Sequence, residues 1–153
     1  YIAGYTAADD PYCQRHLHHQ IFRHVYPWAG QFRHVDIAKG ETHFVAHQDI
    51  DARLEGLFHS AAADHFYQHR DLPAFARAAA AFLIKLNLIH PFREGNGRTQ
   101  RVLLSQMARQ AGHQIGWSGI SETNMRQACI AGLQGDPQPM TRLLMVYLSA
   151  MQG

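Results

Sequence analysis

Long hydrophobic runs are missing from this chain of 153 residues, and the longest uninterrupted apolar stretch is Ala78–Ile84. A transmembrane helix needs about 20 apolar residues, so the sequence predicts no membrane protein. The first residues also lack the basic and then apolar pattern of a secretory signal. Because the chain begins with Tyr1 rather than Met, we expect it to be a fragment of a longer protein. Its length predicts a single domain, residues 1–153, with one sizeable core.

Cysteine and lysine are both rare. The two cysteines, Cys13 and Cys129, lie far apart, which argues against a disulfide framework or a zinc site and favours a reducing compartment. The net charge of +2 is too small to indicate a nucleic-acid-binding protein. Residues 1–71 carry a net charge of −3, residues 72–153 carry +5, and 12 of the 14 basic residues are Arg. The excess of arginine in residues 72–153 therefore predicts an anion or phosphate site in that half of the chain.

Histidine is abundant, with 12 residues in the whole chain. His16, His18, His19 and His24 form a local cluster, in which His16 and His19 would share a helix face. No Cys or carboxylate follows at a matching short spacing, as most metal sites would require. We therefore interpret the cluster as polar surface residues rather than as a metal site.

The hydrophobic pattern is mostly helical. From Phe75 to Ile89 apolar residues recur at spacings of four and three, which predicts a buried helix that ends before Pro91. Further helices are expected from Asp9 to before Pro27, over 50–67, from Arg98 to a cap at Gly112, over 121–133 and over 140–151. Short alternating stretches around Lys39-Gly40-Glu41 predict a β-hairpin. The predicted fold class is all-α, a helical bundle with a small β-hairpin flap.

The segment His90–Arg101 joins two predicted helices and has the features of a phosphate site. Gly95 and Gly97 let backbone N–H groups approach a ligand, and we expect both to adopt positive φ. The N-terminus of the following helix favours an anion. Arg98 and Arg101, three residues apart on its first turn, can reach one polyphosphate together.

Two more residues of this segment suit group transfer. Glu94 is an isolated carboxylate among arginines, and beside phosphates it would be repulsive unless a cation such as Mg²⁺ lay between them. His90 closes the preceding helix, where an imidazole can serve as a general base near neutral pH. The alternative interpretation, a glycine-containing connection with exposed arginines, explains each residue singly but not their combination.

At every defined position these residues resemble the signature of the Fic family, His-x-Phe-x-(Asp/Glu)-Gly-Asn-Gly-Arg-x-x-Arg. A second block, His19, Phe22 and Tyr26–Gly30 followed by Arg33, resembles the upstream helix and Trp-Ala-Gly turn of the family. The resemblance implies a Fic-type helical bundle in which Lys39 and Phe44 belong to a flap that docks a segment of the target protein.

The resemblance also implies an activity. Fic enzymes are similar in transferring AMP from ATP to a Tyr, Thr or Ser hydroxyl of a target protein. His90 would be the catalytic base, and Glu94 would hold Mg²⁺ on the phosphates. The residues implied in binding ATP and its phosphates are Gly95, Asn96, Gly97, Arg98 and Arg101. Asn124, Gln127 and Ala128 are weak candidates for the adenine pocket.

Other functions remain as alternatives. The same fold could transfer phosphocholine or phosphate. The kinase-like branch of the family replaces the second Gly and the downstream Arg of the signature, whereas this chain has both, as Gly97 and Arg101, which argues against transfer of phosphate. A non-catalytic domain that binds nucleic acid is a different class of function. The intact His90 and the small net charge argue against it.

Control of the enzyme is the last expectation from the resemblance. Fic enzymes are commonly restrained by a helix with (Ser/Thr)-x-x-x-Glu-(Gly/Asn). Glu55-Gly56 comes nearest, but Asp51 stands where Ser or Thr should. We therefore expect a separate small antitoxin that supplies an inhibitory Glu to Arg101; the alternative is an inhibitory helix on a flanking segment. The protein would be a toxin in the bacterial cytoplasm, or a secreted effector in the host cytosol.

Overall fold

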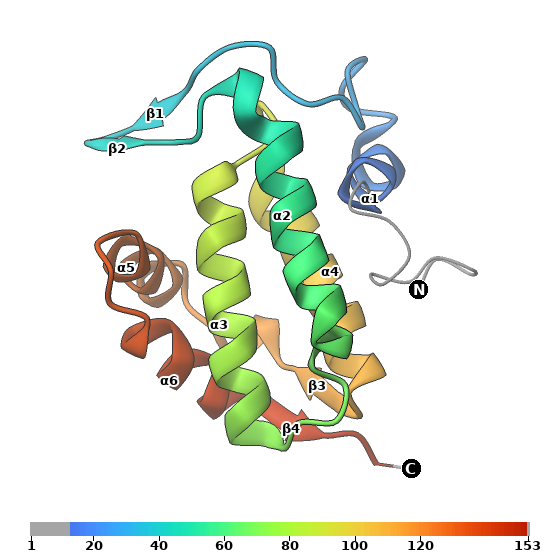
Figure 1. Cartoon of the computed structure of the whole chain (residues 1–153), viewed down its shortest axis with the longest axis vertical. Helices are drawn as coiled ribbons and strands as arrows, with labels where there is room; N and C mark the ends of the chain where they lie inside the picture. Colours follow the sequence, from blue (N-terminus) through green and yellow to red (C-terminus); the bar gives the residue numbers. More distant parts are fainter. Residues whose placement is uncertain (1–12, 153) are drawn as a thin grey trace.

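The computed structural model describes residues 13–152, which form six α-helices and two two-stranded sheets (Figure 1). The helices are α1 (Cys13–Phe22), α2 (Ile50–Ala63), α3 (Leu72–Ile89), α4 (Asn96–Gln110), α5 (Glu122–Leu133) and α6 (Gln138–Tyr147). The strands are β1 (Ala38–Lys39), β2 (Thr42–His43), β3 (His113–Ile115) and β4 (Leu148–Ala150). Short 3-10 turns span His47–Asp49, His65–Tyr67 and Trp117–Gly119. The predicted all-α bundle with a β-hairpin flap is confirmed.

The predicted apolar stripe is the buried face of α3, which packs against α2, α4, α5 and α6. The helix begins where the Asp71 side chain accepts a hydrogen bond of 3.0 Å from the Ala74 N–H, a typical N-cap. It ends at His90, which adopts a left-handed conformation (φ 47°) before Pro91. By length and composition alone, α3 could cross a membrane. In this structure it is the core helix of the bundle.

The hairpin around Lys39-Gly40-Glu41 is also confirmed. In β1 and β2, Ala38 pairs with His43 and Lys39 with Thr42, and Gly40 takes the positive φ (61°) that the turn requires. Figure 1 shows this flap projecting from the bundle above α5. The flap therefore stands at one end of α3, beside the loop that leads to α4.

Several predicted helix boundaries were wrong: α1 ends at Phe22 rather than just before Pro27, and α6 begins at Gln138 rather than at residue 140. The helix expected from Arg98 begins at Asn96. The helix expected over 50–67 ends at Ala63, and a 3-10 turn follows that buries Phe66. The helix expected over 140–151 ends at Tyr147, because 148–150 pairs as β4 with β3. Strands β3 and β4 are far apart in the sequence and too short to show the apolar–polar alternation of a strand, so the sequence did not indicate this sheet. The helix start expected at Asp9 lies outside the described residues.

Candidate active site

His90 lies at the C-terminal end of α3, under the flap. The ring of Phe44 stacks on its imidazole, with ring centroids 4.0 Å apart and planes 13° apart. Burial lowers the pKa of His90 to about 4, an effect that a hydrogen bond with the Asn87 backbone opposes and the charges of Arg33 and Lys39 reinforce. The imidazole is therefore neutral near pH 7, as a group that accepts a proton must be.

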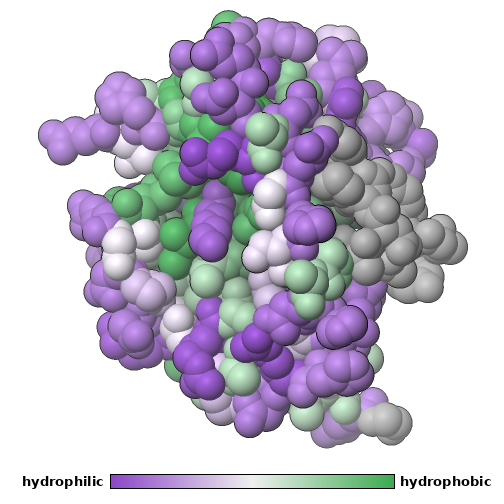
Figure 2. Space-filling view, in the orientation of Figure 1, coloured by the Kyte–Doolittle hydropathy of each residue, from purple (hydrophilic) through white to green (hydrophobic). Residues whose placement is uncertain are grey.

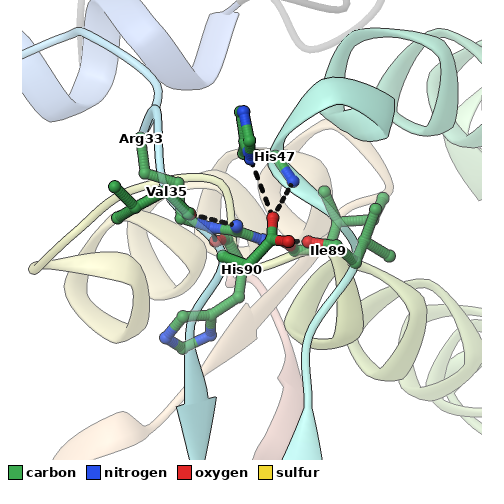
Figure 3. Close-up of polar contacts among 7 residues, drawn as sticks. Arg33, Val35, His47, Ile89 and His90 are labelled. Atoms are coloured by element: carbon green, nitrogen blue, oxygen red, sulfur yellow. Dashed lines mark hydrogen bonds and ion pairs between the residues drawn. The ribbon is translucent and has the colours of Figure 1, made fainter.

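A buried arginine connects the end of α3 to the flap. Arg33 is 2% exposed, and its guanidinium donates hydrogen bonds to four backbone carbonyls (Figure 3). The bonds to His90 and Val35 measure 2.8 Å and that to Ile89 measures 3.1 Å; the fourth acceptor is Val45. Burial also lowers the pKa of Arg33, whereas the negative charge of Asp36 raises it. Arg33 thus holds the backbone of His90 in place, a role that its position after the Trp-Ala-Gly turn did not indicate.

The loop between α3 and α4 is fastened from inside by Asn96. Its side chain accepts a hydrogen bond of 3.0 Å from the Phe92 N–H and donates one of 2.7 Å to the Phe92 carbonyl. Asn96 is only 4% exposed, and Phe92 is fully buried as an anchor of the loop. The Asn96 side chain is thus engaged with Phe92 inside the loop, whereas its backbone N–H lies at the start of α4.

The two glycines of the loop differ. Gly95 has a φ of 83°, and a Cβ there would lie 2.6 Å from Cζ of Phe22, so both the backbone and the packing require glycine. The expected positive φ of Gly97 was wrong: it lies in the first turn of α4, and a Cβ there would meet no atom within 4 Å. Gly97 thus leaves open space beside the N-terminal N–H groups of α4.

Arg98 and Arg101 are exposed on the first turns of α4. The Arg98 guanidinium lies 5.3 Å from the centroid of the Phe22 ring. Neither arginine has an ion pair among residues 13–152. Two unpaired guanidinium groups and the free N–H groups of a helix N-terminus make this end of α4 suitable for a polyphosphate.

A cleft of about 580 Å³ opens between the flap and α5. It brings together predicted residues from three parts of the chain, Lys39, Phe44, His90 and Arg101. Its wall on α5 is largely apolar and includes Met125, Cys129, Ile130 and Leu133. Figure 2 shows hydrophobic surface in the hollow below the flap.

The expected adenine candidates lie elsewhere. Asn124, Gln127 and Ala128 line a different pocket, between α5 and α6. A helix presents residues three or four apart on one face, and the face of α5 that carries Met125 and Cys129 is the one in the cleft. The apolar residues of that face were thus missed, because the sequence does not tell which side of α5 the flap would cover.

The interpretation of the histidine cluster was wrong for His18. Its side chain is fully buried, with Nε2 2.8 Å from the Glu94 carbonyl oxygen and Nδ1 2.9 Å from the Gly30 N–H. His16 is half-buried, while His19 and His24 are exposed. Among the described residues no three His, Cys, Asp or Glu side chains are grouped as metal ligands.

Glu94 is the one carboxylate of the loop, and it is exposed. A single carboxylate fits Mg²⁺, which commonly takes one or two protein carboxylates and completes its shell with water and substrate phosphates. The donor set of this chain is therefore compatible with Mg²⁺ only when a phosphate ligand shares it.

The chain is similar to known proteins in both sequence and fold. Residues 12–108 match the model of the Fic/DOC family. The chain is 41% identical over 127 residues to a probable protein adenylyltransferase, y4lH, of Sinorhizobium fredii, with 82% of this chain and 66% of that protein covered. It is 34% identical over 128 residues to the protein adenylyltransferase VbhT of Bartonella schoenbuchensis, with 84% and 27% covered. The chain thus spans about two thirds of the first relative and about a quarter of the second.

The fold is similar to that of a solved structure with a bound nucleotide. The crystal structure of BepC, a VirB-translocated effector protein of Bartonella tribocorum, contains AMPPNP. It matches with a TM-score of 0.89 and 27% identity, over 94% of this chain and 76% of that one.

Proposed function

The chain belongs to the Fic/DOC family, and we propose that it is a protein adenylyltransferase, which transfers AMP from ATP to a Tyr, Thr or Ser hydroxyl of a target protein. The observation that carries the proposal is the position of a neutral His90 in the same cleft as Arg101. Two relatives bear the name protein adenylyltransferase, and the similar BepC structure holds AMPPNP.

The reaction requires a base and charge neutralisation. An imidazole nitrogen of His90 accepts the proton of the target hydroxyl, whose oxygen forms a bond to the α-phosphorus of ATP. The bond from that phosphorus to the bridging oxygen breaks, and pyrophosphate leaves. The N–H groups at Gly95, Asn96 and Gly97 would bind phosphate oxygens at the end of α4.

Charged side chains complete the binding of the nucleotide. Arg98 and Arg101 would contact the β- and γ-phosphates, where they offset the negative charge that pyrophosphate carries away. Glu94 would hold Mg²⁺, which when bound supplies further charge neutralisation at the phosphates. The apolar face of α5, with Met125 and Cys129, lies where it could cover the base of the nucleotide.

The flap is suited to hold the target. Lys39 on β1 is exposed, and the short hairpin leaves backbone groups free for an added strand of the target. Phe44 lies on His90, so the ring is placed to clamp the residue that is modified. This position supports a role at the site rather than in the hydrophobic core.

Labelled ATP tests the proposal. The protein is incubated with a bacterial lysate and ATP labelled at the α- or the γ-phosphate. Transfer of AMP labels proteins only from the α-position, whereas transfer of phosphate labels them only from the γ-position. If neither position labels any protein, the proposal is wrong and transfer of another group, such as phosphocholine, is next to be tested. Mass spectrometry for added AMP, with His90→Ala as control, then identifies the target.

We further propose that a separate small antitoxin restrains the enzyme in the bacterial cytoplasm, by supplying a Glu to Arg101. The exposed guanidinium of Arg101 has no ion pair among residues 13–152, which leaves it open to a carboxylate from another chain. Purification from the native operon should yield a complex, and Glu→Gly in the partner should release activity. A full-length protein that is inactive alone, with no partner bound, would contradict this model.

A further inference from the structure

His18 of α1 is buried between two segments that are far apart in the sequence. On one side lies the turn that ends at Gly30, and on the other lies the loop that precedes α4. Its ring also stacks on Phe92, with centroids 3.9 Å apart and planes 18° apart. The cleft, by contrast, is lined by other residues, so His18 does not reach a ligand there.

The two hydrogen bonds of His18 determine its tautomer. The Gly30 N–H donates to Nδ1 over 2.9 Å, so Nδ1 carries no proton. The proton of the neutral ring is then on Nε2, which donates to the Glu94 carbonyl oxygen over 2.8 Å. Burial and, to a smaller extent, the charge of His19 lower the pKa of His18, whereas the hydrogen bond to Glu94 raises it. The net lowering of the pKa agrees with a neutral ring.

The hydrogen bond to the Glu94 carbonyl also orients the N–H of the same peptide unit, which belongs to Gly95. In a trans peptide the C=O and the next N–H point in opposite directions. Because the Glu94 carbonyl points to His18, the Gly95 N–H points away from His18, and Gly95 is the residue directly before α4 and its arginines. Gly95 has no side chain to limit this orientation, and its φ of 83° is one of several that glycine can adopt.

We propose that His18 is a positioning residue for the phosphate site: by holding the Glu94 carbonyl it sets the direction of the Gly95 N–H toward the nucleotide. This inference rests on the proposed function. It assigns to His18 an effect on nucleotide affinity that acts entirely through the Glu94–Gly95 peptide, since His18 itself touches no ligand.

Three variants separate the two hydrogen bonds from the packing. In His18→Gln the amide nitrogen can occupy the place of Nε2 and donate to Glu94. In His18→Asn the amide oxygen can occupy the place of Nδ1 and accept from Gly30, but the bond to Glu94 is lost. His18→Phe keeps a ring on Phe92 and loses both bonds. His24→Phe, at an exposed position of the same segment, is the matched control.

The readout is the Kd for ATP by calorimetry, with kcat, KM for ATP and the unfolding midpoint measured alongside. We expect His18→Asn and His18→Phe to raise the Kd and KM for ATP about tenfold, the equivalent of one lost hydrogen bond. His18→Gln should recover most of this affinity, and His24→Phe should match the wild type. A merely structural role would lower the unfolding midpoint and the active fraction but leave the Kd of the folded protein unchanged.

Equal Kd values for His18→Gln and His18→Asn would overturn the inference, as would wild-type affinity in His18→Phe. If His18→Phe fails to fold, the Gln and Asn pair decides alone. If the wild type binds ATP and labels its target, and these variants bind ATP equally well, only the role of His18 is contradicted. Wild-type protein that does not bind ATP contradicts the proposed function and this inference together.

Discussion

The ring of Phe44 lies flat on the imidazole of His90, with the two centroids 4.0 Å apart. One residue comes from the flap and the other from the end of α3, so the flap covers the proposed catalytic base. This cover contributes to the burial that lowers the pKa of His90 to about 4. The position of the flap and the proton affinity of the base are therefore coupled.

Removal of the Phe44 ring should change the pH profile. His90 accepts a proton only when neutral, so the wild type should keep its activity as the pH falls from 8 to about 5. In Phe44→Ala the imidazole is more hydrated, and its pKa should rise from about 4 toward the ordinary value of 6.5. AMP transfer by the variant, measured as kcat against pH, should then fall below about pH 6.5. Phe44→Leu, which keeps an apolar cover, should resemble the wild type; identical profiles for all three proteins would exclude the coupling.

His90→Ala should separate chemistry from binding. Loss of a general base typically costs about 10²–10⁴-fold in rate, whereas the nucleotide is bound mainly by the loop and the arginines. We expect the Kd for ATP to stay within about twofold of the wild type. His59→Ala, at an exposed position on α2, is the control. Full transfer by His90→Ala, or loss of ATP binding in a folded protein, would contradict the assignment of the base.

Alanine at the two loop glycines should have opposite effects on stability. Gly95→Ala places a Cβ against the Phe22 ring at a φ of 83° and should lower the free energy of unfolding by about 2 kcal/mol. Gly97→Ala lies in open space within α4 and should raise it by up to about 1 kcal/mol. The same Gly97→Ala should weaken ATP binding about tenfold, because its Cβ would stand in the phosphate site. Urea unfolding and calorimetry test both, and unchanged ATP affinity in Gly97→Ala would place the phosphates elsewhere.

Arg33→Met should destabilise the protein and the position of His90 together. The substitution leaves four backbone carbonyl oxygens, including that of His90, without the donor that Arg33 supplies. We expect a loss of about 3 kcal/mol in the free energy of unfolding, measured with urea, and a lower kcat. Arg77→Met, at an exposed position on α3, should change neither. Equal stability of the two variants would show that the hydrogen bonds of Arg33 contribute little.

Glu94→Gln should weaken the dependence of activity on Mg²⁺. A neutral amide is a poorer ligand for Mg²⁺ than a carboxylate, so half-maximal activity should require about tenfold more Mg²⁺. Glu94→Asp keeps the charge and should be tolerated. The measurement is AMP transfer against Mg²⁺ concentration, after removal of metal with EDTA. Activity that responds neither to EDTA nor to Glu94→Gln would rule out this metal site.

The chemistry proposed for the loop rests on residues that are neighbours in the sequence. His90, Glu94 and the two arginines stand within one short connection, and a helix N-terminus follows directly. The start of α4 was missed by two residues, because the Thr99 N–H bonds to the Gly95 carbonyl oxygen and the helix therefore begins at Asn96. The conformation of Gly97 was missed for the same reason, since it lies inside that longer helix.

The helical class, the flap and the set of charged residues that the loop places together all followed from the amino-acid sequence. These depend on periodicity, on turn residues and on side-chain types at short spacing, all of which are local. Three contacts become visible only in the folded chain: His18 is buried against Glu94, Arg33 holds the backbone of His90, and Phe44 covers the His90 ring. Their partners lie 76, 57 and 46 residues away. Whether a polar side chain is solvated or buried depends on which distant segment packs against it, and that information exists only after the chain has folded.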